Sequence, residues 1–266
     1  MWSIIKRNFR DRRGSLLIYS AFSVALLWMY IALYPSFSNQ TGSLEQLIAS
    51  YPEGFLKAFN FDIKSFTTVE GFLATEQFSF VWPLLVILLS LSFSGSAFSG
   101  EIEDGTMQIL LSQPISRLKL FFSKYLSGLL MIILFTFISI YTVIPLNMIY
   151  DIPYKSDNFF TLMILALLFA WSIYSIGIFF SSIFSKKGKV LFVTGMILVV
   201  MYVLNIISSI KDSLSDLKYF SFFYYFNPAK ALVYNQVDYW SYLAFGIVII
   251  FCSVAGLIYF NKRDAI

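Results

Sequence analysis

The sequence contains no histidine and only one cysteine, Cys252. Without histidine, a serine–histidine–aspartate triad, histidine-based acid–base catalysis and the usual zinc sites are excluded. A single cysteine allows no disulfide within the chain. The pattern G-x-x-x-x-G-K-[ST], whose backbone amides and lysine hold the phosphates of ATP, is also absent from the sequence. Charge is scarce, since Asp, Glu, Lys and Arg make up 13% of the 266 residues.

What the sequence has in abundance is apolar residues, which make up 58% of the chain, with a mean hydropathy of +0.75. A helix needs about 20 apolar residues to cross a bilayer. Six runs have roughly this length and are apolar all round rather than on one face. They predict an all-α integral membrane protein, a single transmembrane domain over residues 1–266 whose six spans are residues 16–34, 78–99, 118–144, 159–184, 190–210 and 239–260.

The distribution of Lys and Arg predicts the orientation of these spans. If the N-terminus is cytoplasmic, 13 of the 19 basic residues lie inside and 6 lie outside, on longer loops. The positive-inside rule therefore places both termini in the cytoplasm. The first run, 16–34, exceeds the ~7–15 apolar residues of a signal peptide, so we expect it to remain as the first span.

Acidic residues are absent from the middle of every predicted span, since all 15 fall in polar segments or at span edges. Carriers that use an ion gradient need an ionisable group at membrane depth, so this distribution argues against a self-powered carrier. Asn147 and Asn205 are the strongest polar candidates within spans, and we interpret them as contacts between helices.

The polar segment 100–125, which reads GEIEDGTMQILLSQPISRLKLFFSKY, separates the second and third spans. Glu101, Glu103 and Asp104 favour the start of a helix, where the helix dipole stabilises negative charge. Pro114 ends that helix because it lacks an N–H group, and Ser116 can cap the next one. The pattern predicts a short cytoplasmic helix over 101–113, stiffly joined to two spans; the simpler interpretation is a solvated loop.

This segment resembles the coupling segment of ATP-binding-cassette (ABC) type-2 exporter permeases. That family shows approximately the pattern E-x-x-x-G-T-x-x-x-L-L-x-x-P-x-S-R…K. The stretches 50–61 and 71–73, in an expected external loop over 36–77, also resemble the family, as do the number of spans and the length of the chain. The matching positions of the coupling segment are Glu101, Gly105, Thr106, Leu110, Leu111, Pro114, Ser116, Arg117 and Lys124.

The resemblance implies roles for three groups of residues. The residues expected to contact an ATPase are Glu101, Glu103, Asp104, Gly105, Thr106, Leu110, Pro114 and Arg117. An interfacial connecting helix at the N-terminus carries Trp2, Ile5, Phe9 and Arg10, although these residues also suit simple anchoring to anionic lipid. An external re-entrant segment before the last span carries Phe223, Tyr224, Asn227 and Pro228, although its run of aromatic residues also suits an interfacial belt.

The function implied is that of a non-catalytic permease subunit in the plasma membrane of a prokaryote. ATP and Mg²⁺ are expected on a separate ATPase subunit, with no cofactor or metal on this chain. Closed symmetry predicts a second permease copy, with a homodimer simplest and a heterodimer possible. The cargo is expected to be amphipathic or apolar, such as a drug, antibiotic, peptide or lipid, and no residue is assigned to it; nucleic acid is not an expected partner. The alternatives are a channel or secondary carrier without an ATPase, and a membrane-embedded enzyme.

Overall fold

The computed structural model describes residues 2–38 and 68–263. The middle of the predicted external loop, residues 39–67, lies outside the described residues, as do the short helices that its apolar residues suggest. Within the described residues, all regular secondary structure is helical.

Six helical segments are long and apolar enough to cross a membrane, which confirms the predicted number of spans. The second and third segments are composite, because a π-helix precedes the main helix in one and a short helix follows it in the other. In chain order they are α1 (Trp2–Ser38), then α4 (Val69–Leu73) with η2 (Ala74–Val81) and α5 (Trp82–Gly95), then α8 (Arg117–Tyr141) with α9 (Val143–Ile149), α10 (Ser156–Ile183), α11 (Lys187–Ile210) and α14 (Tyr239–Lys262).

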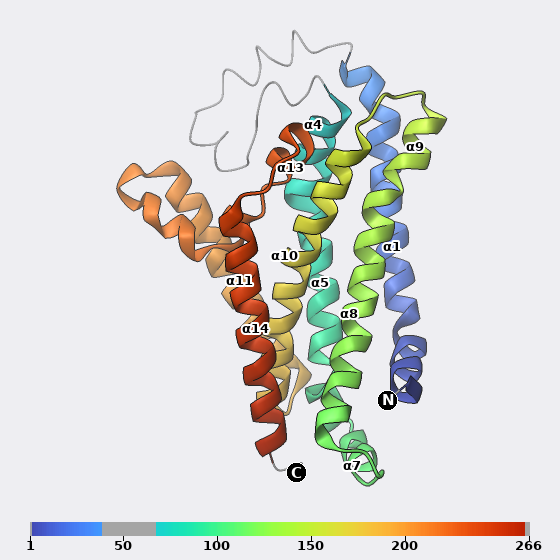
Figure 1. The fold of residues 1–266 in the computed structure, drawn as a ribbon, viewed down its shortest axis with the longest axis vertical. Helices are drawn as coiled ribbons and strands as arrows, with labels where there is room; N and C mark the ends of the chain where they lie inside the picture. Colours follow the sequence, from blue (N-terminus) through green and yellow to red (C-terminus); the bar gives the residue numbers. More distant parts are fainter. Residues whose placement is uncertain (1, 39–67, 264–266) are drawn as a thin grey trace.

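Five shorter helices lie between these segments. They are α6 (Ser99–Glu103), α7 (Thr106–Leu111), η3 (Asp212–Phe220), α12 (Phe222–Tyr225) and α13 (Pro228–Tyr234). In Figure 1, α7 lies at the same end of the bundle as the start of α1 and the end of α14, whereas α4, α9 and α13 lie at the opposite end. We call the end that carries α7 the cytoplasmic end, following the orientation predicted from the basic residues.

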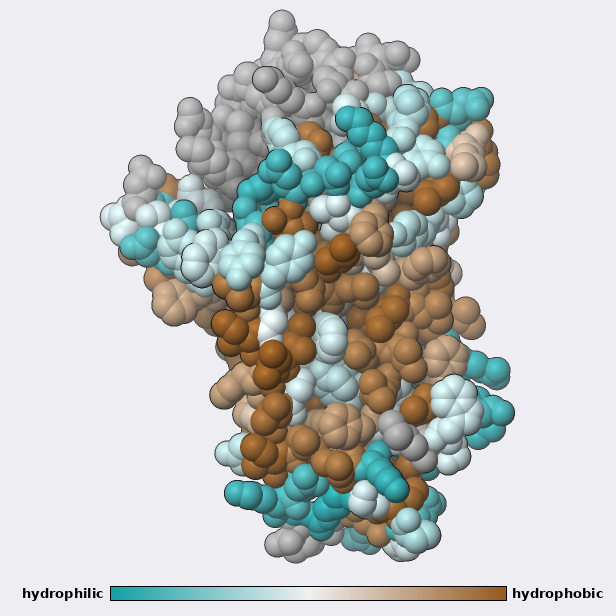
Figure 2. All heavy atoms as spheres, viewed as in Figure 1, coloured by the Kyte–Doolittle hydropathy of each residue, from teal (hydrophilic) through white to brown (hydrophobic). Residues whose placement is uncertain are grey.

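The helix α10 forms the centre of the bundle. It packs against α14, α5, α8, α11 and α13. Of the residues in its most apolar stretch, 72% are buried inside the protein, compared with 17% for α11. Figure 2 shows a broad band of apolar residues between hydrophilic residues at the two ends, as expected for a surface that contacts lipid.

A close approach between α8 and α10 depends on Gly128. A Cβ atom at this position would lie 2.2 Å from the hydroxyl oxygen of Tyr174. That hydroxyl donates a hydrogen bond of 3.1 Å to the backbone carbonyl of Tyr125. A small residue on α8 therefore lets a buried tyrosine on α10 lie against the backbone of its neighbour, as is common where membrane helices pack closely.

Candidate functional site

The candidate site is the segment that links α5 to α8, which we call the joint (residues 99–116). Its first helix, α6, follows Phe98, which has no side chain to cap the free N–H groups of the first turn. The hydroxyl of Ser181 on α10 accepts hydrogen bonds from the backbone N–H groups of Phe98 (3.2 Å) and Ser99 (3.1 Å). The central helix of the bundle therefore caps the start of the joint.

The joint contains two short helices where the sequence predicted one over 101–113. Gly105 lies between them with a φ of 72°, in the left-handed region that glycine adopts readily. This conformation ends α6 and redirects the chain into α7. The second helix ends at Leu111, before Pro114, and the hydroxyl of Ser116 accepts from the N–H of Lys119 as the N-cap of α8.

Glu101 is bound on three sides within the chain rather than exposed. One carboxylate oxygen accepts a hydrogen bond of 2.8 Å from Arg7 on α1 and forms an ion pair with Lys124 on α8. The other accepts from the hydroxyl of Thr106 on α7. Burial raises the pKa of Glu101, but Lys124, Thr106 and Arg7 together outweigh it, so the pKa is lowered and the carboxylate is charged at neutral pH.

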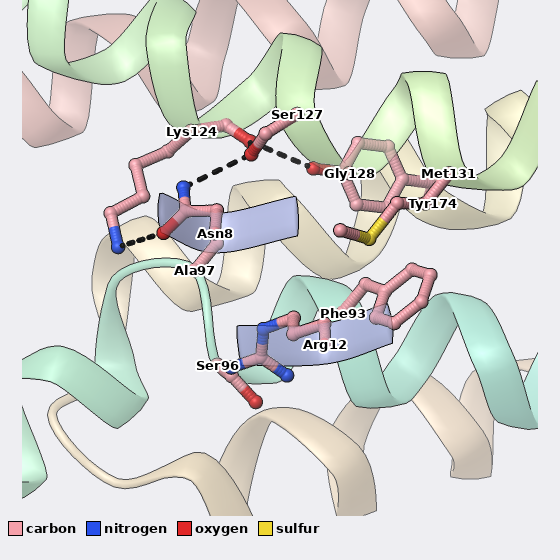
Figure 3. Close-up of a pocket in the computed structure, with 10 residues that line it drawn as sticks. All are labelled: Asn8, Arg12, Phe93, Ser96, Ala97, Lys124, Ser127, Gly128, Met131 and Tyr174. Carbon is pink, nitrogen blue, oxygen red and sulfur yellow. Dashed lines mark hydrogen bonds between the residues drawn. The ribbon is translucent and has the colours of Figure 1, made fainter. Parts of the chain in front are cut away.

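Lys124 extends this cluster towards the core. Its side chain is only 3% exposed, and it donates a hydrogen bond of 3.2 Å to the amide oxygen of Asn8, whose nitrogen donates to Ser127 at 3.0 Å. Figure 3 shows these side chains beside a small cavity of about 20 Å³ between α1, α5, α8 and α10. That volume admits about one water molecule, and polar groups from Arg12 and Tyr174 also line it.

Charged side chains of the joint and its neighbours also satisfy the ends of other helices. Glu103 accepts a hydrogen bond of 2.8 Å from the backbone N–H of Lys187, in the first turn of α11. Arg117 donates to the carbonyl oxygens of Asn261 (3.0 Å) and Arg263 at the end of α14. Acids at helix starts and bases at helix ends agree with the sign of the helix dipole. Arg263 in turn donates to the carbonyl of Phe184 at the end of α10, at 2.9 Å.

The outer surface of α7 differs from the surface that the sequence predicted. Leu110, which was assigned to ATPase contact, is buried together with Met107. The exposed residues of this helix are Gln108 and Ile109, and the side chain of Ile109 is 64% exposed. Sequence reasoning missed both because the family pattern leaves their positions unspecified. The helical period contains the signal, since burial of positions 107 and 110 turns 108 and 109 outward.

The other residues predicted to contact an ATPase divide into two groups. The side chains of Glu101, Glu103, Thr106 and Arg117 make the contacts described above within the chain. Those of Asp104 and Pro114 are exposed, as is Gly105.

The N-terminal residues are helical, but they form one continuous helix with the first span. No proline interrupts α1 before Pro35, and the single Gly14 costs only about 1 kcal/mol relative to alanine, so nothing separates an interfacial helix from the span. Ile4 and Asn8 face the bundle. The residues assigned to the connecting helix do not face the bundle. Trp2, Phe9 and Arg10 are exposed and Ile5 is half-buried, which leaves these side chains available to lipid.

The predicted external segment folds back against the bundle through Phe226. Its ring stacks between Phe169 on α10 (4.4 Å between centroids) and Trp82 on α5 (5.7 Å). Phe169 lies 13 residues after the start of α10, about 20 Å along the helix. The segment therefore packs into the bundle through a residue that the sequence analysis did not single out.

Those residues lie around Phe226. Phe223 contacts the rings of Phe169 and Tyr202, while Tyr224 is partly exposed. Asn227 caps α13 by accepting from the N–H of Lys230 at 2.9 Å, and Pro228 is its first residue. Proline suits this position because the first turn of a helix needs no N–H group from it.

Comparison with known families supports the resemblance over nearly the whole chain. A family model described as ABC-2 family transporter protein matches residues 2–265. That range includes the joint, the N-terminal helix and the external segment. No curated protein matches the sequence. Among the described residues, no cluster of three or more Cys, Asp or Glu side chains is arranged to hold a metal ion.

Proposed function

The chain belongs to the ABC-2 transporter family and is a membrane-spanning permease component of such a transporter; we propose that ATP hydrolysis on a separate ATPase subunit drives export through it by displacing the joint. ATP and Mg²⁺ would bind the ATPase, because this sequence has no phosphate-binding loop. The observation that carries the proposal is the attachment of the joint, together with Arg117 directly after it, to five long helices.

Those attachments would convert a push on the joint into movement of the bundle. Ser181 connects the joint to α10, and Glu101 connects it to α1 and α8. Glu103 connects it to α11, and Arg117, directly after it, holds the end of α14. A displacement of the joint must therefore move these helix ends or break charge-assisted hydrogen bonds, which are stronger than neutral ones.

The exposed face of α7 would be the part that the ATPase contacts. Ile109 and Gln108 are exposed on α7, and Asp104, four residues before Gln108, is exposed as well. An exposed apolar side chain within a polar rim is typical of an interface anchor. Buried Leu110 and Met107 would keep α7 in place while the contact forms.

A second permease copy would complete the translocation path. The main helix of the second span, α5, leaves Leu84 and Leu88 exposed, and α5 packs against α1 and α11. Two such faces, opposed across a two-fold axis, would enclose a path lined by the first, second and fifth spans. A homodimer is the simplest such assembly.

An ion-coupled carrier without an ATPase is less consistent with the geometry. The buried ion pair of the described residues, Glu101 with Lys124, lies at the cytoplasmic end of the bundle rather than at mid-membrane. Its carboxylate has three partners and a lowered pKa, which opposes the proton binding and release that such a carrier needs.

The proposal is tested by co-purification. A neighbouring reading frame should encode an ABC ATPase, and that subunit should co-purify with the tagged permease. Ile109→Arg should lower the recovered ATPase and the substrate-stimulated ATP hydrolysis about tenfold or more, an interface loss of about 1.4 kcal/mol. The matched control is Ile149→Arg, because Ile149 is similarly exposed (71%) but lies on α9 at the opposite end.

Two results would contradict the proposal. One is the absence of any co-purifying ATPase. The other is an equal loss of ATPase in the Ile109→Arg and Ile149→Arg variants, which would indicate a general defect rather than a contact at α7.

A further inference from the structure

A cleft of about 650 Å³ opens at the cytoplasmic end between α1, the joint and α11. Its lining is strongly charged, and the other contributors, Ser96, Gly100 and Thr106, are small. The cations are Arg7, Arg10, Arg12 and Lys187, and the acids are Asp11, Glu101, Glu103 and Asp104.

The acids are mostly engaged, whereas three cations are not paired. Glu101 and Glu103 bind the partners described above, and Asp11 lies 3.9 Å from Arg7. Within the described part of the chain, Arg10, Arg12 and the ammonium of Lys187 have no carboxylate within 4.0 Å; Arg12 donates one hydrogen bond, of 3.3 Å, to the carbonyl of Ser92. Among the described lining acids, the exposed Asp104 has no partner and Glu103 bonds only a backbone N–H group. Three cations without a carboxylate therefore face two acids without a cation, which leaves the cleft a small excess of unpaired positive charge.

A strip along α5, polar at its cleft end and apolar further on, leads from this cleft into the membrane. It follows one face of α5 from Ser96 through Ser92 to the exposed side chains of Leu88 and Leu84, about 18 Å along the helix. That distance slightly exceeds half of the ~30 Å hydrocarbon thickness. The strip therefore reaches from the cytoplasmic headgroup level to about mid-membrane.

The two helices that pack against α5 here, α1 and α11, also carry exposed apolar residues. On α1, the flank that carries Arg7 and Asp11 continues at helical spacing with the exposed side chains of Ile18 and Phe22. On α11, Leu191 contacts Gly95 of α5, and Phe192 beside it is exposed. The charged cleft, two serines and two exposed leucines thus follow one another along α5.

We propose that this surface binds an amphipathic molecule with an anionic phosphate headgroup and acyl tails, taken from the cytoplasmic leaflet. Arg10, Arg12 and Lys187 contact the phosphate, and the tails lie over Leu84 and Leu88. Basic pockets between membrane helices on the cytoplasmic side suit such headgroups, and arginine binds phosphate with paired N–H groups. Binding requires no ATPase; the role of this molecule as cargo rests on the proposed function.

The test measures lipid binding to the purified full-length chain in detergent by native mass spectrometry. Phosphatidylglycerol is compared with phosphatidylcholine of the same acyl chains, and glycerol 3-phosphate represents the headgroup without tails. The variant is Arg10→Gln with Lys187→Gln. The control is Arg13→Gln with Lys189→Gln, because it removes the same charge from the same two helices at exposed residues outside the cleft.

We expect phosphatidylglycerol to bind more tightly than the other two ligands. The cleft variant should lose about 30-fold in affinity for it, the effect of two basic contacts at about 1 kcal/mol each. The control should change it less than about threefold, because charges on other faces of the helices act only through screened, longer-range attraction. Arg12→Gln should show a separate loss of about fivefold or more.

Four results would overturn the inference. They are an equal loss in the cleft and control variants, equally tight binding of glycerol 3-phosphate, equally tight binding of phosphatidylcholine, and a two-chain species that carries no lipid because a second copy covers the strip. Co-purification of the ATPase is independent of these readouts. If the ATPase binds and the lipid does not, this inference fails and the proposed function stands. If the lipid binds and the ATPase does not, the proposed function fails and lipid binding at the cleft stands.

Discussion

The carboxylate of Glu103 accepts a hydrogen bond of 2.8 Å from the backbone N–H of Lys187, so the end of α6 caps the start of α11. Glu101, two residues earlier on the same short helix, binds Arg7 on α1 and Lys124 on α8. Two acids of the joint thus hold three different helices. Because α6 has only five residues, from Ser99 to Glu103, a small rotation of this helix would strain all of these contacts together.

Removing the cap on α11 should lower stability by a modest amount. Glu103→Ala leaves an N–H of the first turn without its acceptor and removes a negative charge from the positive end of the helix, at a cost of about 1 kcal/mol. Glu103→Gln keeps an acceptor and should cost less. Thermal unfolding of the protein in detergent measures both. Asp104→Ala is the control, since that neighbouring acid is exposed, and a loss as large as that of Glu103→Ala would contradict the assignment.

Replacing one member of the buried ion pair should lower the stability of the protein more than replacing both members. Glu101→Gln leaves the ammonium of Lys124 buried without its carboxylate, a change that costs about 3–5 kcal/mol in other proteins, or about half of that here if Asn8 and the introduced amide oxygen share the charge. The double variant Glu101→Gln with Lys124→Met removes the stranded charge. We expect it to be more stable than Glu101→Gln alone, as chemical unfolding would show. Additive losses would mean that the two residues are not coupled.

The same pair predicts how stability depends on pH. Because the pKa of Glu101 is lower in the folded protein than in the unfolded chain, its stabilising contribution is fully present above the unfolded value of about 4.3. That contribution is lost as the pH falls through the lower, folded pKa. The difference in melting temperature between the wild type and Glu101→Gln should therefore stay constant from pH 8 to about 5.5 and shrink below about pH 4. A constant difference down to about pH 3 would contradict the charge pairing.

The approach of α8 to α10 should not tolerate a methyl group. Gly128→Ala places a Cβ atom 2.2 Å from the hydroxyl oxygen of Tyr174, so the ring must move or the helices must separate, at a cost of about 1–3 kcal/mol. Gly188→Ala is the matched control, because no atom lies within 4 Å of its added Cβ and alanine favours the helix by up to about 1 kcal/mol. The melting temperature should fall for the first variant and stay level or rise for the second. Equal effects would show that the contact is not tight.

The sequence was sufficient for features that depend on local composition. Six apolar runs of membrane length predict six spans because each run must meet the same hydrocarbon thickness wherever it packs. Ser116 was predicted as a cap because hydrogen bonding between a side chain and an N–H three residues later is also local. Asn227 and Pro228 carried a local signal as well, an N-cap followed by proline at the first helical position, which predicts a helix start rather than a break.

Features that depend on tertiary contacts could not be predicted in this way. The residues that flank Glu101 in the sequence are polar and charged, as on an exposed surface. Its burial follows only from the positions of Arg7 and Lys124, which are 94 and 23 residues away in sequence. Ser181 caps α6 from a different helix, 82 residues after Ser99. The division of the joint into two helices depends on the left-handed conformation of Gly105, which glycine permits but does not impose.

The orientation of the bundle can be measured with single cysteines. Cys252 is buried, so exposed cysteines introduced elsewhere should dominate labelling. Gln113→Cys lies in the joint and Gln236→Cys follows α13, at opposite ends of the bundle. Because basic residues gather at the end that contains the joint, the positive-inside rule predicts that a membrane-impermeant maleimide labels Gln236→Cys in intact cells and Gln113→Cys only after permeabilisation. The two ends are connected by continuous helices, so this pair assigns all six spans; the reverse pattern would place the joint outside the cell, where no ATPase could reach it.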